Sequence, residues 1–105
     1  MSSIPTLTDA NFDAEVLAAE VPVLVDFTAT WCPPCRALEP ILAQLQGEAA
    51  GRYAIYSIDV DANPAITERY GVRSAPTMIT FKKGAPSQSH IGLTNRQKIL
   101  TMILG

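Results

Sequence analysis

The sequence predicts a single α/β domain over residues 1–105, with a central mixed β-sheet flanked by helices on both faces. Three observations predict this class. Short apolar runs alternate with stretches of helical period. No internal repeat, low-complexity tract or linker divides the chain. With 105 residues, 48% of them hydrophobic, the chain can bury one core without disulfides or metal and leaves no room for a second domain.

The N-terminal quarter predicts a helix and then a buried strand. Thr8 or Asp9 can cap a helix that runs to about Ala19, and a weak strand at residues 4–6 is left open. The segment VPVLVDF, residues 21–27, is almost continuously apolar rather than alternating. That pattern is typical of a central strand covered on both faces.

The middle of the chain predicts two helices with a strand between them. Leucines and an isoleucine at helical spacing indicate a helix from the cysteines to about Ala49. YAIYSIDV, residues 53–60, predicts a second buried strand. A short helix should follow, capped by Asn63, with Pro64 in its first position and Gly71 just past its end.

The last third predicts a hairpin and a final helix. TMITF (77–81) and SQSHI (87–91) flank the turn-forming KKGAP, which indicates an antiparallel hairpin at the end of the sheet. Thr94 and Gln97 match a capping box ahead of an apolar stripe of helical period. The predicted order from the first long strand onward is βαβαββα.

The charge and the N-terminal composition exclude several partners. A net charge of −2 provides no basic footprint for nucleic acid or for an anionic membrane. No apolar run approaches membrane-spanning length, and the start MSSIPTLTDANF lacks a positive segment followed by an apolar one. With Met1 read as an initiator, we expect a cytoplasmic protein, in a compartment where thiols are kept reduced and disulfides tend to be transient.

Residues 31–35, WCPPC, contain both cysteines and the single tryptophan of the chain. A Cys32–Cys35 bond would be a poor structural staple, because so short a loop contributes only about 2 kcal/mol, against about 3 kcal/mol for a fifteen-residue loop. In a reducing compartment a purely structural disulfide is the weaker alternative. The spacing therefore indicates reactivity.

The same spacing predicts which sulfur attacks a substrate disulfide. The attacking species is a thiolate, whereas a free cysteine near neutral pH is mostly thiol. Cys32, at the first turn of a helix, would lie among unpaired N–H groups at the positive end of the helix dipole, which favours the anion. We expect Cys32 to be the nucleophile and Cys35, one turn on, to attack the resulting mixed disulfide.

Two consecutive prolines separate the cysteines. Pro33 and Pro34 have φ already near the helical value, so they should hold the turn in one geometry. They also remove two of the three N–H donors that follow Cys32 and leave only that of Cys35. Rigidity and stabilisation of the thiolate pull in opposite directions, so the direction of the effect on the redox potential stays open.

Asp26 and Trp31 are the other candidates near the cysteines. Asp26 interrupts an apolar strand, where burial would raise its pKa and make it a proton acceptor for Cys35. The alternative is an exposed acid at a strand end. Trp31 is adjacent to Cys32, which favours a docking role over core packing, the usual place of a large aromatic side chain.

No metal site is expected from the residues of the chain. A closed zinc site needs four ligands, and the chain offers two sulfurs and one distant histidine, His90, expected at the surface. The stretch DVDAN, residues 59–63, resembles the start of a calcium loop. Its sixth position is Pro64 instead of glycine and its twelfth is Tyr70 instead of glutamate, which excludes calcium there.

Taken together, these motifs make the sequence resemble the thioredoxin family over nearly its whole length. The residues that carry the resemblance are WCPPC at 31–35, VDF with Asp26, Pro40, DANP at 61–64, APT with Pro76, Phe81 with Gly84, and Gly92. A lone CxxC is a weak signal, whereas this ordered set is highly specific.

The resemblance implies a thioredoxin fold and a monomeric dithiol carrier that reduces disulfides in target proteins. It also implies re-reduction by a flavin-dependent or ferredoxin-linked reductase, no bound cofactor, and a proton-transfer role for Asp26. A cis Ala75–Pro76 bond is implied, which would expose Ala75 backbone groups to an extended substrate segment beside Cys32. The implied substrate-binding residues are Trp31, Pro33, Pro34, Ala75, Pro76 and Gly92, the last as a point of close backbone approach.

Four residues depart from the commoner family pattern. Glycine is commoner at Pro33, and a lysine commonly pairs with the buried acid where this chain has Ser57. Without that cation, desolvation is less opposed, so we predict a strongly raised pKa for Asp26. Thr28 and Thr30 stand where an aromatic residue and an acidic or small residue are common, which leaves the preference for partners open.

Two rival interpretations remain. A proline after the first cysteine also occurs in more oxidising oxidases or isomerases and in cytochrome-maturation reductants, although the missing signal and inserts weigh against these. The rival from a different class is a non-catalytic binding module. It predicts that function survives replacement of both cysteines by serine.

Overall fold

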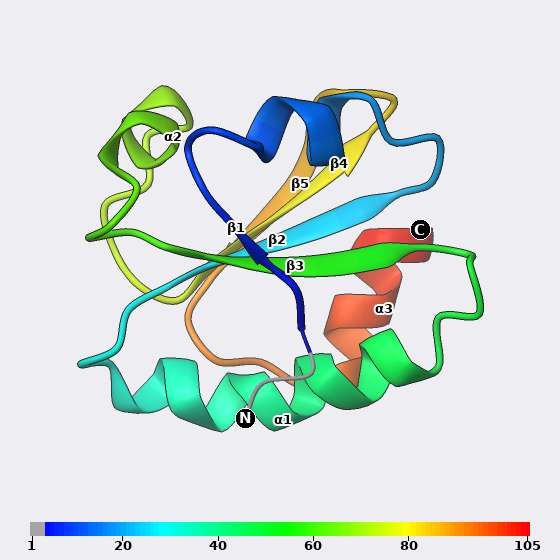
Figure 1. Cartoon of the computed structure of the whole chain (residues 1–105). Helices are drawn as coiled ribbons and strands as arrows, with labels where there is room; N and C mark the ends of the chain where they lie inside the picture. The colour runs from blue at the N-terminus through cyan, green and yellow to red at the C-terminus, as the bar shows by residue number, and fades with distance from the viewer. Residues whose placement is uncertain (1–3) are drawn as a thin grey trace.

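A five-stranded sheet with the strand order β1-β3-β2-β4-β5 forms the centre of the structure, a computed structural model that describes residues 4–105 (Figure 1). The elements are β1 (Thr6–Leu7), the π-helical turn η1 (Asp13–Leu17), β2 (Val23–Thr28), α1 (Pro33–Gly47), β3 (Ala54–Asp59), α2 (Pro64–Arg69), β4 (Thr77–Lys82), β5 (Ala85–Ile91) and α3 (Arg96–Leu104). Strands β1, β3 and β2 are parallel, and β4 and β5 continue the sheet antiparallel. The predicted mixed sheet is therefore confirmed.

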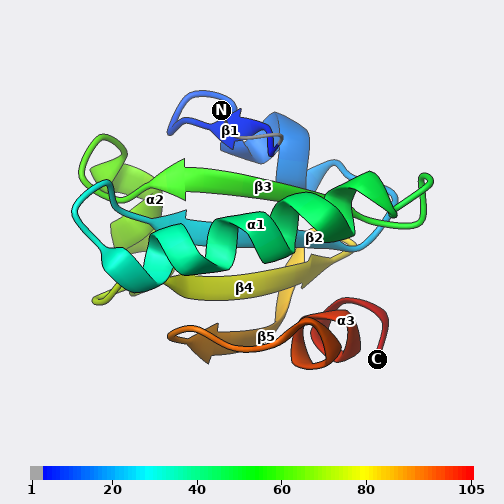
Figure 2. The ribbon, with the colours of Figure 1, turned by 90° about the horizontal axis from the view of Figure 1, so that it is seen from below.

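Helices cover both faces of the sheet, as the sequence predicts. In Figure 1, α1 and α3 lie below the sheet and η1 and α2 lie above it. Figure 2 views the molecule from below and shows α1 in front of the strands. Two hydrophobic clusters fill the two interfaces. The lower one includes Leu24, Leu38, Leu42, Leu45, Ile55, Ile99 and Ile103, and the upper one includes Phe12, Val16, Val25, Phe27, Ile66 and Phe81.

Strand β2 explains how an acid comes to lie beneath α1. Side chains alternate along a strand, and Leu24 belongs to the cluster under α1 while Val25 belongs to the opposite cluster. Asp26 therefore faces α1. Its neighbours in register are Ser57 on β3 and Met78 on β4. The chain thus places one carboxyl group in the middle of the sheet, on the face that carries the helix of the two cysteines.

The helix predicted from Thr8 or Asp9 to Ala19 is wrong in its extent. Thr8 closes a turn with Asn11, its N–H donating to Asn11 Oδ1 at 2.7 Å and its Oγ1 accepting from Asn11 N at 3.3 Å. Only the five residues of η1 follow, and they are π-helical. The weak strand left open at residues 4–6 corresponds to β1, which begins two residues later and ends one residue later.

The cap predicted for α2 comes from elsewhere in the chain. Pro64 is the first helical residue and Gly71 follows the end with φ +65°, as expected, but the Asn63 side chain makes no capping hydrogen bond. Its Oδ1 accepts from Asp9 N at 2.9 Å. The Asp9 carboxylate in turn accepts from Ala65 N at 3.2 Å and Ile66 N at 2.9 Å. Asp9 therefore caps α2 from a position more than fifty residues earlier in the sequence.

The C-terminal elements differ from prediction at their boundaries. Lys83 and Gly84 both have positive φ, 53° and 79°, so a two-residue turn closes the hairpin and β5 begins at Ala85 rather than at residue 87. The capping box predicted for Thr94 and Gln97 is also wrong. Asn95 caps α3, its side chain accepting from Lys98 N at 2.9 Å, because asparagine is at least as good a cap as threonine and stands one residue closer to the helix.

Candidate active site

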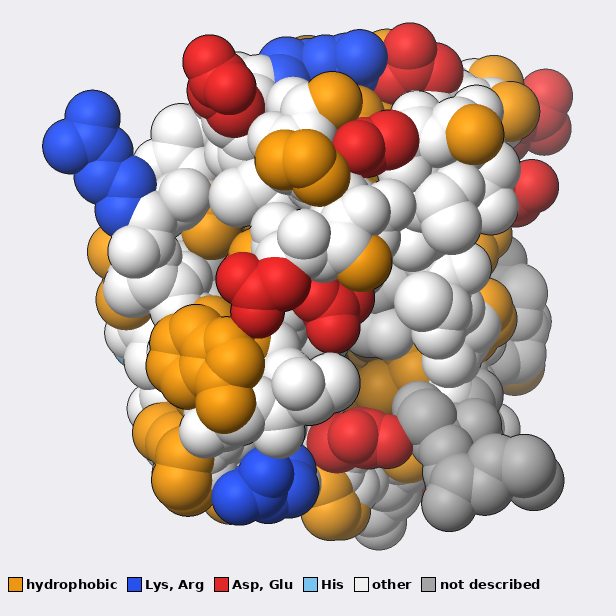
Figure 3. Space-filling view, turned by 60° about the vertical axis from the view of Figure 1, so that its left-hand side comes forward, with side chains coloured by type: hydrophobic (Ala, Val, Ile, Leu, Met, Phe, Trp, Pro, Cys, Tyr) orange, Lys and Arg blue, Asp and Glu red, His pale blue; other side chains and the backbone are white. Residues whose placement is uncertain are grey.

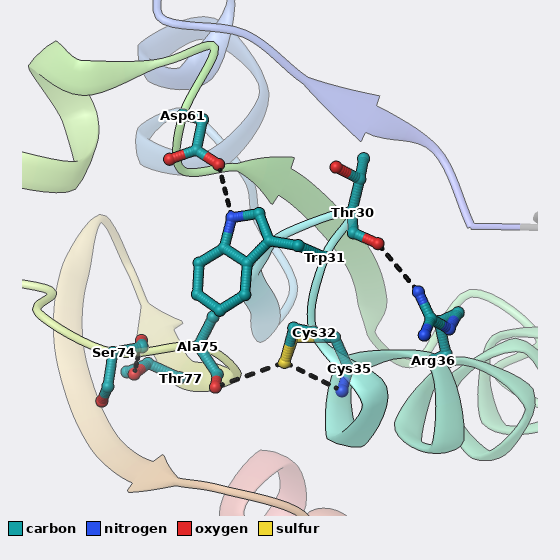
Figure 4. Close-up of a disulfide and its surroundings, with 9 residues drawn as sticks. All are labelled: Thr30, Trp31, Cys32, Cys35, Arg36, Asp61, Ser74, Ala75 and Thr77. Carbon is teal, nitrogen blue, oxygen red and sulfur yellow. Dashed lines mark hydrogen bonds between the residues drawn. A yellow bond between two sulfur atoms is a disulfide. The ribbon is translucent and has the colours of Figure 1, made fainter.

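The two cysteines stand at the N-terminus of α1, where β2 and its following loop lead into the helix (Figure 4). Cys32 is the N-cap residue, with extended backbone angles of φ −104° and ψ 108°, and Cys35 lies in the first turn. Their Cα atoms are 5.2 Å apart and a disulfide joins the sulfurs. Both residues are buried, at 2% and 3% exposure.

The Cys32 sulfur has two polar neighbours. It accepts a hydrogen bond from Cys35 N at 3.2 Å and lies 3.4 Å from the Ala75 carbonyl oxygen (Figure 4). Pro33 and Pro34 occupy the first two helical positions and carry no N–H. The structure confirms that, of the three amides after Cys32, the one left by the prolines reaches its sulfur.

Exposed side chains surround the buried sulfurs. Trp31 is 66% exposed, so its alternative as core packing is wrong, and Pro33 and Pro34 are exposed as well. The Trp31 indole Nε1 donates to Asp61 Oδ2 at 2.8 Å, which holds the ring beside the cysteines (Figure 4). No role at this site was predicted for Asp61 from the sequence. Its position two residues after β3, at the edge where α1 also begins, was the available signal.

Ala75, Pro76 and Gly92 lie on the other side of the Cys32 sulfur. The Ala75–Pro76 bond is cis, as the family resemblance implies, and Gly92 N donates to Pro76 O at 2.8 Å. A Cβ atom on Gly92 would meet no atom of the described chain within 4 Å, and the φ of +95° by itself favours glycine there.

A groove of about 230 Å³ runs from the tryptophan towards this cis bond. It is lined by Trp31, Val60, Asp61, Thr67, Val72, Arg73, Ser74 and Ala75. Most of these residues were not singled out from the sequence, because they come from three separate loops and from α2, which only the fold brings together. Figure 3, which turns this side of the molecule forward, shows acidic and hydrophobic side chains across the face and basic ones towards its margins.

Asp26 is buried beneath α1 at 3% exposure, so the alternative of an exposed strand-end acid is wrong. Its Oδ1 has no hydrogen-bond partner among the described residues. Burial, reinforced by the nearby Glu39 carboxylate, raises the pKa of Asp26 from 3.8 to about 7. This is the direction predicted from Ser57, which stands directly opposite on β3. Sequence reasoning missed Glu39, although its spacing of four residues from Cys35 placed it on the same side of α1.

Neither a metal cluster nor a membrane-spanning helix is found in the described part of the chain. Within residues 4–105, no three His, Cys, Asp or Glu side chains are grouped so that they could hold a metal ion. His90 is half-buried on β5, opposite Met78. The helices of the same residues are too short or too polar to cross a bilayer.

Comparison with known proteins points to one family. A family model described as Thioredoxin matches residues 3–104. The chain is 44% identical over 96 residues to "Thioredoxin M4, chloroplastic" of Arabidopsis thaliana, covering 91% of this chain and 50% of that protein. It is 41% identical over 97 residues to a thioredoxin of Rickettsia felis, covering 92% of each, and 40% identical over 102 residues to "Thioredoxin C-2" of Corynebacterium nephridii, covering 97% and 94%. The chain thus spans half the length of the plant relative and nearly all of these bacterial ones.

Proposed function

The chain belongs to the thioredoxin family and is a thiol–disulfide oxidoreductase that acts on protein disulfides, and we propose that Cys32 is its nucleophile and Cys35 its resolving thiol. One observation carries this assignment of roles. The Cys32 sulfur occupies the N-cap position of α1 and accepts the Cys35 N–H, whereas Cys35 lies inside the helix. An anion is stabilised at the first position and not at the second.

In the first step, the reduced Cys32 thiolate attacks one sulfur of a substrate disulfide. A bond forms between Cys32 Sγ and that sulfur, the substrate S–S bond breaks, and the other substrate sulfur leaves as a thiolate that takes up a proton. The Cys35 N–H and the end of the helix dipole hold the attacking thiolate. The product of this step is a mixed disulfide.

In the second step, Cys35 attacks Cys32 within the mixed disulfide. The Cys35 thiol gives its proton to Asp26, the Cys32–Cys35 bond forms, and the second substrate sulfur leaves as a thiolate and is then protonated. Two electrons have passed from the cysteine pair to the substrate. A helical spacing of one turn, held by two prolines, makes this step intramolecular.

The residues around the sulfurs would bind the substrate. Trp31, Pro33 and Pro34 are exposed beside the cysteines, whereas Ala75 and Gly92 are half-buried and Pro76 is buried, on the side of Cys32 where the Ala75 carbonyl lies. The Ala75 backbone lies next to Cys32, so an extended substrate segment that pairs with it would present its sulfur to the nucleophile. Because this pairing involves backbone groups, it would suit target proteins that differ in their side chains.

The remaining parts of the proposal concern recycling and location. We place the protein in the cytoplasm as a monomeric electron carrier without bound cofactor, because the two sulfurs hold both electrons of the reaction. A flavin-dependent or ferredoxin-linked reductase would re-reduce the pair. Single-turnover reduction of the oxidised protein by each class of reductase, followed by counting of the free thiols on Cys32 and Cys35, would identify which one serves it.

Trapping of the mixed disulfide tests the proposed roles. Cys35→Ser should hold target proteins on Cys32 as adducts that dithiothreitol releases, whereas Cys32→Ser and the double variant should hold none. The wild type should also accelerate insulin reduction by dithiothreitol. A Cys35→Ser variant that traps nothing, together with insulin reduction no faster than with dithiothreitol alone, would favour the non-catalytic binding module.

A further inference from the structure

Glu39 of α1 lines two adjoining cavities that lead from Asp26 to the surface beside Cys35. The inner cavity, about 70 Å³, is lined by Ile4, Asp26, Thr28, Glu39 and Ser57. The outer one, about 290 Å³, has Cys35 and Asp59 in its wall and shares Thr28 and Glu39 with the inner one. Glu39 is half-buried, whereas Asp26 is buried. One carboxylate therefore separates the enclosed acid from the open space next to the resolving cysteine.

Helix geometry places Glu39 next to Cys35. Residues four apart on an α-helix lie on the same face, and Cys35 and Glu39 have this spacing within α1. The face concerned is the one that packs on the sheet, because Leu38 and Leu42 of α1 belong to the same buried cluster as Leu24 of β2. Asp26 projects from the strand towards this helix. Glu39 can thus approach both groups between which the proposed proton transfer occurs.

We propose that Glu39 is a positioning residue for the exchange reaction that acts through Asp26, relaying protons between the enclosed carboxyl group and solvent. This rests on the proposed role of Asp26 as the acceptor of the Cys35 proton. In the resolving step Asp26 receives that proton and must release it before the next cycle. The released proton passes to the Glu39 carboxylate and from there to bulk water, so no other reactant is needed.

The inner cavity suits such a transfer. Its volume exceeds what one water molecule requires, and four of its five lining residues carry polar side chains, Asp26, Thr28, Glu39 and Ser57. A water there would find the two to four polar partners that ordered buried water requires. Ser57 stands where a lysine is common in the family. Because serine is neutral, the Glu39 carboxylate is the charged neighbour of Asp26 in this cavity.

The charges around Asp26 support the assignment. From α1, Glu39 lines the same inner cavity as Asp26; from β3, Ser57 is neutral and Asp59 lines the outer cavity; from β4, Met78 is neutral. Arg36 also lines the outer cavity, but its guanidinium donates to Thr30 O at 2.9 Å. The negative charge of Glu39 adds to burial in raising the pKa of Asp26. A base that titrates near neutral pH can both take and return a proton.

Glu39→Gln removes the charge and the proton-accepting oxygen while keeping the size of the side chain, and Glu20→Gln at an exposed site between η1 and β2 is the matched control. The titration of Asp26 is followed by carboxyl ¹³C NMR in the oxidised protein. The resolving rate is followed from pH 6 to 8 as the second release of thionitrobenzoate when the reduced protein reacts with Ellman's reagent.

The expected result is a lower Asp26 midpoint in Glu39→Gln and an unchanged one in Glu20→Gln. With a midpoint of about 7, the resolving rate at pH 6 is about a tenth of that at pH 8, and lowering the midpoint by half a pH unit raises this ratio about 2.5-fold. An Asp26 midpoint that does not move, or a rate profile that stays in place while the midpoint moves, would overturn the proposal. Insulin reduction retained in either case shows that the proposed function stands without Glu39.

Discussion

Asparagine does not ionise, so Asp26→Asn should remove the loss of folding stability that the ionisation of Asp26 causes as the pH rises. The side chain lies under α1 at 3% exposure, and its pKa is raised from 3.8 to about 7. The folded protein therefore holds a proton on Asp26 in a pH range where the unfolded chain has lost it. Below pH 3.8 both states are protonated and ionisation costs nothing. As the pH rises from 3.8 towards 7, the unfolded state is progressively favoured, so the wild type loses stability over this window.

The size of this loss follows from the shift in pKa. A rise from 3.8 to about 7 corresponds to a difference of about 4 kcal/mol between the folded and unfolded states once both are ionised. At pH 4 the same linkage relation leaves a difference of only about 0.6 kcal/mol. The asparagine amide has its own burial cost, but that cost is the same at both pH values. The change in the stability difference between pH 4 and pH 8, about 3 to 4 kcal/mol, is thus the quantity to measure.

Urea unfolding of the oxidised wild type and Asp26→Asn at several pH values from 4 to 8 measures this change. The oxidised form is used because its cysteines do not titrate. The free energy of unfolding of the variant should rise relative to the wild type as the pH increases and level off above pH 7. Asp61→Asn, at the exposed end of the Trp31 hydrogen bond, should show no such trend. A difference between wild type and Asp26→Asn that stays constant within 0.5 kcal/mol would refute the assigned burial cost, on the scale of a one-unit shift being about 1.4 kcal/mol.

Three further predictions follow from particular contacts. Asp9→Ala should destabilise the protein by about 1 kcal/mol and speed amide exchange at the start of α2, whereas Asp13→Ala, which loses an exposed ion pair, should change stability less; equal effects would contradict the capping assignment. Gly84→Ala should lower the free energy of unfolding in urea by at least about 1 kcal/mol, because the φ of Gly84 is +79° and the new Cβ would lie 2.9 Å from a backbone oxygen of η1. In the control Gly47→Ala, in α1, the new Cβ meets no atom within 4 Å, so this change should be neutral or stabilising. In the reduced protein, iodoacetamide at pH 7 should modify Cys32 before its partner, as peptide mapping would show; equal rates would remove the basis for naming a nucleophile.

Much of the fold was predictable because its signals are local. The apolar run before the cysteines specified a strand covered on both faces, and the structure places β2 between two hydrophobic clusters. An acid within that run was expected to be buried, with an exposed strand end as the alternative, and Asp26 is buried. The missing N–H groups of Pro33 and Pro34 likewise determined which amide remains near Cys32. Each of these inferences used residues within one element.

Several features that the residues of one element could not predict depend on distant residues or on the folded state. Nothing near Asn63 indicates that its side chain would bind Asp9 N, or that the Asp9 carboxylate would take its place as the cap of α2. The groove beside Trp31 combines loops that meet only in the folded protein. The cis Ala75–Pro76 bond was expected from the family resemblance alone, because a trans bond is the usual state before proline.

The burial of Asp26 has two consequences: it lowers the stability of the folded protein, and it suits the carboxyl group to its proposed role as a proton acceptor. An ordinary cysteine thiol has a pKa of about 8.5, so a carboxylate with a pKa of 3.8 would accept its proton at a cost of more than four powers of ten. At an Asp26 pKa of about 7, the cost of this proton transfer falls to between one and two powers of ten. The same burial removes about 4 kcal/mol from a net stability that is usually only about 5–15 kcal/mol. A variant such as Asp26→Asn should therefore be more stable above neutral pH and slower in the resolving step, and a gain in both would mean that the buried acid takes no part in the exchange.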